Sequence, residues 1–150
     1  MTDPTRPRKL LKGHETIIFD NQNQMYTVTD TSKLIHITNI QSLSSSSSQQ
    51  SSFDKTAEMI EIAYLGNGRP LGGKFDRNGI LYLADAVQGL IRVIFPKKKS
   101  SKPMVELVAS RVQLEDGTWS PILFADDLTI GPKTGMIYFT DGESFFCFFF

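Results

Sequence analysis

Hydrophobic residues recur along the chain in short alternating runs that are separated by turn residues. Three stretches show the pattern most fully: "ETIIFDNQNQMYTVTD" from Glu15, "LGGKFDRNGILYLAD" from Leu71 and "DDLTIGPKTGMIYFTD" from Asp126. Each has an apolar run, a turn rich in Asn, Gly, Gln or Pro, and a second run that is centred on a tyrosine and closed by aspartate. Short alternating runs bounded by such turns predict antiparallel β-strands.

The three stretches repeat at a nearly constant interval of 56 or 55 residues, which two series carry: Tyr26, Tyr82 and Tyr138, and Phe19, Phe75 and Ile130. The runs "KLIHIT", "LIRVIF", "MVELVA" and "EMIEIAYLG" add further strands. Four short strands recurring at roughly fifty residues indicate the blade of a β-propeller. The sequence therefore predicts an all-β fold, a partial propeller of about two and a half four-stranded antiparallel sheets. The second series should lie on inner strands, packed between neighbouring sheets.

Composition and charge exclude several classes of function and say less about the fold. The 150 residues include 16 basic and 16 acidic side chains and are 40% hydrophobic, which is typical of one globular domain. Without net charge or a basic stripe, nucleic-acid binding is not expected, and "PKKKSSK" at 96–102 is interpreted as a solvated turn. Cys147 is the only cysteine, so neither an intramolecular disulfide nor a cysteine zinc site can form.

The domain organisation follows from where the repeat begins and ends. Residues 1–12 form an N-terminal tail, 13–141 form the blades with a Ser/Gln-rich loop at 41–55, and 142–150 are an aberrant hydrophobic tail. No apolar segment has the length of a signal peptide or a transmembrane span. "ESFFCFFF" is interpreted as the product of a truncated or misread coding sequence, with a membrane anchor as the alternative. Because a propeller ring needs roughly four to eight blades, we expect an N-terminal fragment.

Two longer motifs resemble a known family. "GRPLGGKFDRNGILYLADAVQGLIRV" together with "FADDLTIGPKTGMIYFTD" is similar to the strictosidine synthase-like proteins, including the adipocyte plasma membrane-associated proteins, and "GHETIIFD" looks like their first-blade opening. The resemblance covers residues 13–141 apart from the serine insert. It implies a six-bladed propeller, distantly related to the paraoxonases and the gluconolactonase group, in a family commonly found in endomembrane or secretory compartments.

The acidic residues that open the repeats are the candidate metal ligands. Glu15, Leu71 and Asp126 occupy equivalent positions, and the starts of inner strands in a propeller point at one another across the axis. Two carboxylates aimed at one small volume repel unless a cation bridges them, and calcium suits such oxygen ligands. In the paraoxonase-like relatives, a first-blade glutamate and an asparagine that opens a later blade bind a catalytic calcium. The resemblance implies these roles for Glu15 and Asp126.

Two departures from the relatives bear on that site. Asp126 replaces their asparagine with an acid, and Leu71 stands where the gluconolactonase group has a further polar ligand. Asp127 is a candidate for a second or a structural position. Aspartates at strand ends commonly cap turns, so Asp85 and Asp141 are predicted to be structural. For the pair formed by Glu15 and Asp126, a metal site and a structural role both remain open.

The two histidines are weaker candidates for a functional site than the acidic residues. His36 alternates within "LIHIT", which predicts a packed strand residue rather than a ligand, and His14 is of interest only as the neighbour of Glu15.

Two classes of function remain. The first is an enzyme, a calcium-dependent hydrolase of small-molecule esters or lactones, of arylesterase or lactonase type, in which the metal polarises a carbonyl. An amine-aldehyde condensation of the strictosidine synthase type is the alternative chemistry. The second class is a non-catalytic propeller that binds a partner through its faces. Strictosidine synthase's catalytic glutamate lies in the half that is missing, so no catalytic residue is assigned and the chain alone is expected to be inactive.

Overall fold

The computed structural model describes residues 16–39, 57–98 and 101–142, and every regular element in these ranges is a β-strand. Glu15, His14 and Cys147 lie outside the described residues, as do the N-terminal tail, the Ser/Gln-rich loop and nearly all of the hydrophobic tail. The strands are β1 (Ile17–Phe19), β2 (Met25–Val28), β3 (Lys33–Thr38), β4 (Glu58–Tyr64), β5 (Pro70–Phe75), β6 (Leu81–Asp85), β7 (Gly89–Ile94), β8 (Met104–Ala109), β9 (Arg111–Gln113), β10 (Trp119–Pro121), β11 (Ala125–Ile130) and β12 (Ile137–Asp141).

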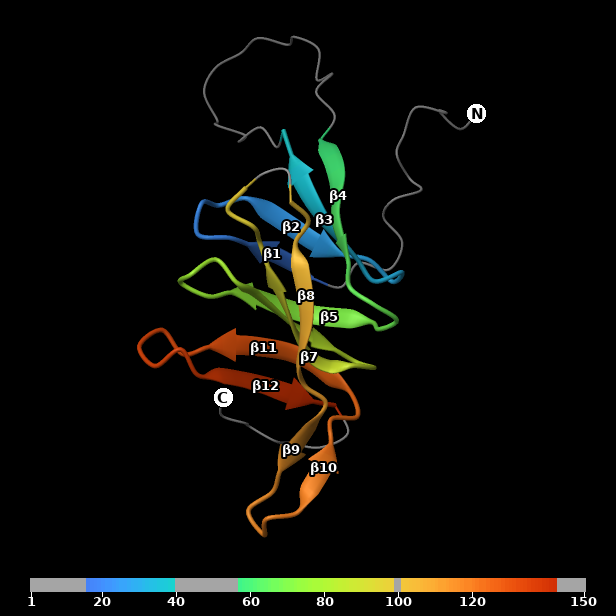
Figure 1. The fold of residues 1–150 in the computed structure, drawn as a ribbon, viewed down its shortest axis with the longest axis vertical. Helices are drawn as coiled ribbons and strands as arrows, with labels where there is room; N and C mark the ends of the chain where they lie inside the picture. The colour runs from blue at the N-terminus through green and yellow to red at the C-terminus, as the bar shows by residue number, and fades with distance from the viewer. Residues whose placement is uncertain (1–15, 40–56, 99–100, 143–150) are drawn as a thin grey trace, which may run out of the picture.

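The strands form two complete antiparallel sheets and part of a third. The first sheet has the order β1-β2-β3-β4, the second β5-β6-β7-β8, and β11 pairs with β12. In Figure 1 these sheets are stacked from top to bottom, and the β9-β10 hairpin extends below them. Each strand pairs with its neighbour in sequence, as in the blades of a propeller. The chain is thus an all-β partial propeller, as the repeats predict.

Apolar residues fill the space between successive sheets. Between the first and second sheets, Leu81 and Leu83 pack with Val28 and Leu34. Between the second sheet and β11-β12, Ala84 lies in a separate buried cluster. Successive residues of a strand point to opposite faces, so β6 supplies one face to each cluster. The second sheet is therefore buried on both sides.

The three residues predicted to pack on inner strands differ in burial. Phe75 is 9% exposed and Ile130 packs against the second cluster, but Phe19 is 54% exposed. Phe75 on β5 points toward the first sheet, and Phe19 occupies the same place on β1, where the described residues provide no preceding sheet. The prediction that Phe19 packs between sheets is therefore wrong for this chain. Ile18 is the residue of β1 that packs into the core.

The sequence patterns located β3, β4, β7 and β8 correctly, but they missed the hairpin of β9 and β10. Its strands are only three residues long and are joined by a turn in which Gly117 has a φ of 85°. The dipeptide Asp116-Gly117 was the available signal. No helix in the three described ranges has the length and apolar character of a membrane span.

Candidate functional site

A β-bulge opens both β5 and β11. In β5, Pro70 pairs with Asp85 and Gly72 with Ala84, so Leu71 is an extra residue. In β11, Ala125 pairs with Asp141 and Leu128 with Phe139, so two aspartates face one residue of β12. A bulge bends the strand and re-aims the side chains at that point. This is why β11 can begin with two adjacent carboxylates beside a buried core.

Asp127 is the fixed member of the acidic pair. Its Oδ1 accepts a hydrogen bond of 2.8 Å from the backbone N–H of Leu128, and its own N–H donates to Thr140 Oγ1 at 3.2 Å. Its backbone also lies against Gly72 of β5. A Cβ on that glycine would stand 2.6 Å from Asp127 Cα and 2.7 Å from the carbonyl oxygen of Asp126. The bulge of β11 therefore packs directly on the second sheet, and only glycine fits between them.

Asp126 is the free member. Its side chain is exposed, and its carboxylate has no hydrogen-bond partner among the residues that the structure describes. The equivalent Leu71 is only 5% exposed and presents no oxygen ligand. A hollow of about 280 Å³ borders Asp127 and the adjoining parts of β11 and β12. Of the two acids, Asp126 alone has both carboxylate oxygens available for a ligand.

The two aspartates that close β6 and β12 are structural, as predicted. Asp85 is fully buried, and its Oδ1 accepts hydrogen bonds from the backbone N–H groups of Arg69 (3.0 Å), Val87 (2.9 Å) and Gln88 (2.8 Å). The carboxylate of Asp85 thus ties the end of β6 to the segment that leads into β5, the inner strand of the same sheet. Asp141 does the same for β12 and β11 by accepting the N–H groups of the two residues that precede β11, Leu123 (3.0 Å) and Phe124 (2.9 Å).

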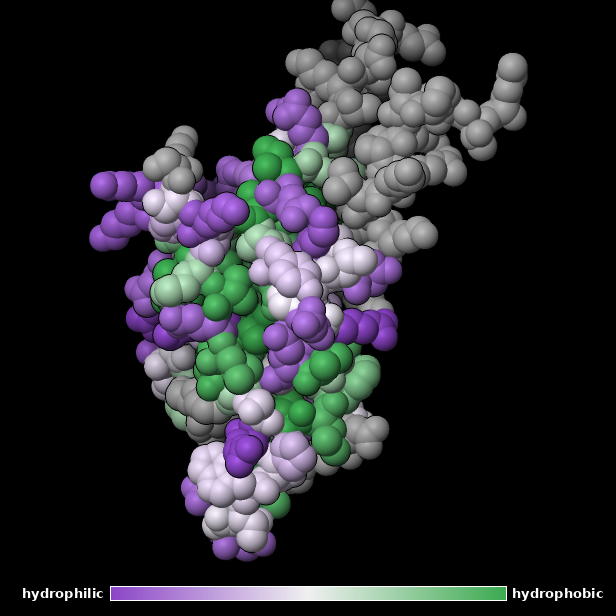
Figure 2. All heavy atoms as spheres, turned by 45° about the vertical axis from the view of Figure 1, so that its right-hand side comes forward, coloured by the Kyte–Doolittle hydropathy of each residue, from purple (hydrophilic) through white to green (hydrophobic). Residues whose placement is uncertain are grey.

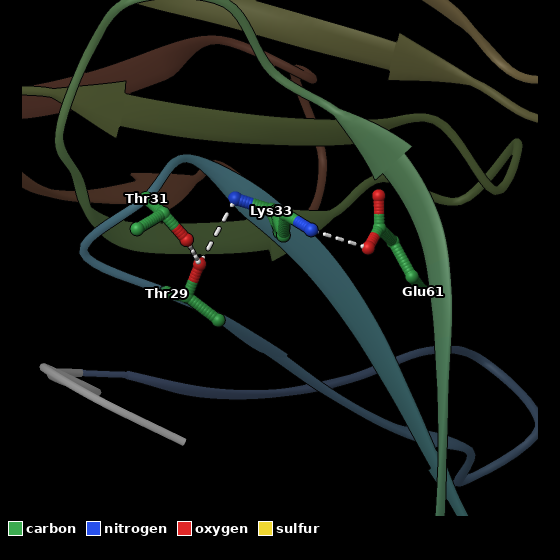
Figure 3. Close-up of polar contacts among 4 residues, drawn as sticks. All are labelled: Thr29, Thr31, Lys33 and Glu61. Atoms are coloured by element: carbon green, nitrogen blue, oxygen red, sulfur yellow. Dashed lines mark hydrogen bonds and ion pairs between the residues drawn. The ribbon is translucent and has the colours of Figure 1, made fainter. Parts of the chain in front are cut away.

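The first sheet closes differently. By the register of the sheets, the position of Asp85 is taken by Thr29 and not by the following Asp30, so the interpretation of that stretch as closed by aspartate is wrong. Thr29 Oγ1 accepts the N–H of Lys33 at 3.1 Å and lies 2.9 Å from the hydroxyl of Thr31, as Figure 3 shows. A neutral hydroxyl therefore replaces the carboxylate in this blade.

His36 is a packed strand residue, as predicted. Its ring stacks on Tyr26 with 4.7 Å between centroids, and Nε2 is buried without a hydrogen-bond partner among the described residues. Burial lowers the pKa of His36 below its usual value, although the nearby Asp20 carboxylate acts in the opposite direction. Burial also raises the pKa of Tyr26, and Asp20 adds to that shift. His36 is therefore held by stacking on Tyr26 within the sheet, a structural role.

The metal site itself stays a prediction. Glu15 lies outside the described residues, so its distance from Asp126 is not defined. Within ranges 16–39, 57–98 and 101–142, no three His, Cys, Asp or Glu side chains gather closely enough to hold a metal ion. The contact of Gly72 with the β11 bulge could not be predicted from the sequence, which shows Gly72 only as one of two glycines in the run "LGGKFD".

Comparison with known proteins gives relatives for about half of the chain. It is 42% identical over 80 residues to the protein STRICTOSIDINE SYNTHASE-LIKE 3 of Arabidopsis thaliana, a match that covers 53% of this chain and 18% of that protein. It is 42% identical over 77 residues to the adipocyte plasma membrane-associated protein of Rattus norvegicus, covering 51% and 19%. The human protein of the same name is 40% identical over 77 residues, covering 51% and 17%.

No family model matches the chain. Each match spans about a fifth or less of the relative's own length. The similarity nevertheless falls on the two groups that the motifs predict, and it accompanies a propeller-like stack of antiparallel sheets. The resemblance of this chain to strictosidine synthase-like and adipocyte plasma membrane-associated proteins is thereby confirmed over about half its length.

Proposed function

We propose that this chain supplies the first blades of a propeller that, when complete, is a calcium-dependent hydrolase of esters or lactones. The observation that carries the proposal is the contrast between the two acids of the β11 bulge. Both side chains are exposed, but Asp127 is held by the Leu128 N–H and by contact with Gly72, whereas the carboxylate of Asp126 has no hydrogen-bond partner among the described residues. A carboxylate without a structural contact, at the start of an inner strand, has both oxygens open to a hard cation.

The described residues fit calcium only in part. Asp126 offers the hard oxygen ligands that calcium prefers, but calcium takes about six to eight of them. Leu71 contributes none, so Glu15 and residues of further blades would complete the set. Calcium held there would polarise an ester carbonyl and stabilise its oxyanion. The contribution of this chain is to present Asp126 at the β11 bulge, next to Asp127, which is held by its own contacts.

The test uses the chain alone and a longer protein that completes the ring. Calorimetry on the 150-residue chain should give weak calcium binding and no ester or lactone turnover. In the longer protein, turnover should require calcium and be lost in Glu15→Gln and in Asp126→Ala. Asp116→Asn, which removes an acid from the exposed β9-β10 turn, is the matched control and should keep full activity. Turnover that survives both chelation and Asp126→Ala would contradict the proposal.

A non-catalytic binding module is the second candidate, and one observation favours it. The second blade presents buried Leu71 where the third presents Asp126, so one of the two described strand starts has no polar group to offer. If later blades resemble the second, an apolar axis would result, which is suited to protein contact and not to metal. In that case the ring-completed protein would bind calcium no more tightly than the isolated chain. A condensation of the strictosidine synthase type remains the alternative chemistry and would appear as amine-dependent consumption of an aldehyde.

A further inference from the structure

A hollow of about 660 Å³ lies between the first and second blades, away from the acidic bulge. One wall is β4, the last strand of the first sheet, through residues 61–64. The other wall is the connection between β7 and β8, through Phe95, Pro96 and residues 101–103. The volume falls within the range of roughly 300–1,000 Å³ that is typical of ligand sites.

The hollow follows the free edge of β4. Within the described part of the chain, β4 pairs only with β3, so its other edge carries unpaired backbone groups. The lining residues of β4 include a β-bulge, because Leu34 pairs with Ala63 and Ile35 with Glu61, which leaves Ile62 as an extra residue. The hollow therefore borders this bulge on the strand whose outer edge is unpaired within the described residues. An unpaired strand edge is a template for another strand.

The side chains around this edge are apolar with a positive rim. Ile62, Ala63 and Phe95 are partly buried at the floor, while Tyr64 is 56% exposed. Figure 2, which turns the right-hand side of Figure 1 forward, shows hydrophobic residues interleaved with strongly hydrophilic ones over this side of the molecule.

The charges on the rim do not cancel. Glu61 is neutralised by Lys33, whose Nζ lies 2.7 Å from its Oε2 across β3 and β4 (Figure 3). Lys102 lines the hollow, and Lys97 and Lys98 follow the lining residue Pro96 in the chain; all three are exposed and have no ion-pair partner among the residues described. The groove therefore has an excess of positive charge beside an apolar floor.

We propose that this groove binds an extended peptide in which apolar and acidic residues alternate, and that the peptide adds to β4 as a fifth strand of the first sheet. Backbone hydrogen bonds to β4 supply the affinity, apolar side chains enter the hollow, and carboxylates meet the lysines of the rim. The partner is a protein segment and not a small molecule, because the unpaired backbone edge is matched only by another backbone. The inference does not depend on the proposed hydrolase function.

The probe is a fluorescein-labelled peptide of the length of β4 with alternating leucine and aspartate, titrated with the 150-residue chain and followed by fluorescence anisotropy. Two further peptides carry N-methyl groups on alternate amides, one on the odd and one on the even positions. In an added strand only one of these series points its amides at β4. One methylated peptide should therefore lose binding while the other keeps it.

Charge variants and hydrogen exchange complete the test. Lys102→Glu should weaken binding about tenfold, and the matched variant Lys133→Glu, in the turn between β11 and β12, should change it less than about twofold. The amides of β4 should exchange more slowly once the peptide is bound.

Three results would overturn the proposal. Equal binding of both methylated peptides would exclude strand addition, and equal effects of the two lysine variants would reveal unspecific attraction. Amides of β4 that are already protected without peptide would mean that a second copy or another part of the chain covers the edge.

Discussion

The strands β5 and β11 begin with the same backbone feature but present different side chains. Both open with a β-bulge, and in both an aspartate at the end of the next strand ties down the incoming segment, Asp85 in one and Asp141 in the other. They differ in what the bulge presents: a buried leucine at Leu71 and an exposed carboxylate at Asp126. The bulge and its aspartate are thus structural parts of a blade, and only the presented side chain can carry chemistry.

The largest expected effect is the loss of the buried tie at β5. Asp85→Ala leaves the N–H groups of Arg69, Val87 and Gln88 without their acceptor in a fully buried site. We expect the free energy of unfolding to fall by about 4 kcal/mol, measured by urea denaturation. Asp141→Ala should cost less, because Asp141 is 8% exposed whereas Asp85 is fully buried. An equal loss in the two variants would show that the cost does not follow the burial of the carboxylate.

Exchanging the side chains that the two bulges present should destabilise the chain at Leu71 but not at Asp126. Leu71→Asp places a carboxylate where the side chain is only 5% exposed, and should destabilise the chain by about 3 kcal/mol. Asp126→Leu replaces an exposed group and should change stability by less than about 1 kcal/mol. Thermal unfolding of both variants measures the difference. Similar losses would mean that the two bulges have the same environment, against the burial that separates them.

Gly72→Ala tests the contact between the two bulges. The added methyl group would meet the backbone of Asp126 and Asp127, so β5 and β11 must separate, at a cost of about 2 kcal/mol. The amide resonance of Leu128 should shift in NMR spectra, since its hydrogen bond to Asp127 depends on the bulge. Adding Asp127→Gly removes the carboxylate but leaves the backbone contact. Stability should then recover only in part, and complete recovery would contradict a backbone clash.

The smallest expected effect is the difference in stability between variants of Asp126 and Asp127. Asp127→Ala removes the acceptor of the Leu128 N–H and should cost about 1 kcal/mol, whereas Asp126→Ala should cost less than about 0.5 kcal/mol. Chemical denaturation with both variants on one day, against the parent chain, resolves such a difference. A larger loss in Asp126→Ala would assign the structural role to the wrong acid.

Local patterns in the sequence predicted the strands but not their surroundings. The alternation that defines β3 or β8 and the turn aspartates are encoded within a few residues, so both could be read directly. Burial of Phe19 depends on a sheet that packs on the far face of β1, and no local signal reports whether one is there. The closing residue of the first blade moved by one position, from Asp30 to Thr29, because strand register decides it.

The candidate site was predictable in composition but not in geometry. The repeat aligned Leu71 with Asp126, and the structure places the two at matching bulges. The sequence could not show that Asp127 is held in place while the carboxylate of Asp126 is free. That difference depends on the contact of Asp127 with Gly72, which is 55 residues away and in another sheet. Contacts of this kind arise only when two blades are stacked.

The lengths of the connections between strands also affect the conformational entropy of the chain. Nineteen residues separate β3 from β4, against nine between β7 and β8, which occupy the same places in their sheets. Because the entropy of closing a loop grows only with the logarithm of its length, the longer connection costs about 0.7 kcal/mol more. That small difference makes β4 easier to detach from its blade than β8 during thermal fluctuation. Its amides should therefore exchange with solvent before those of β8, which is held by the shorter connection.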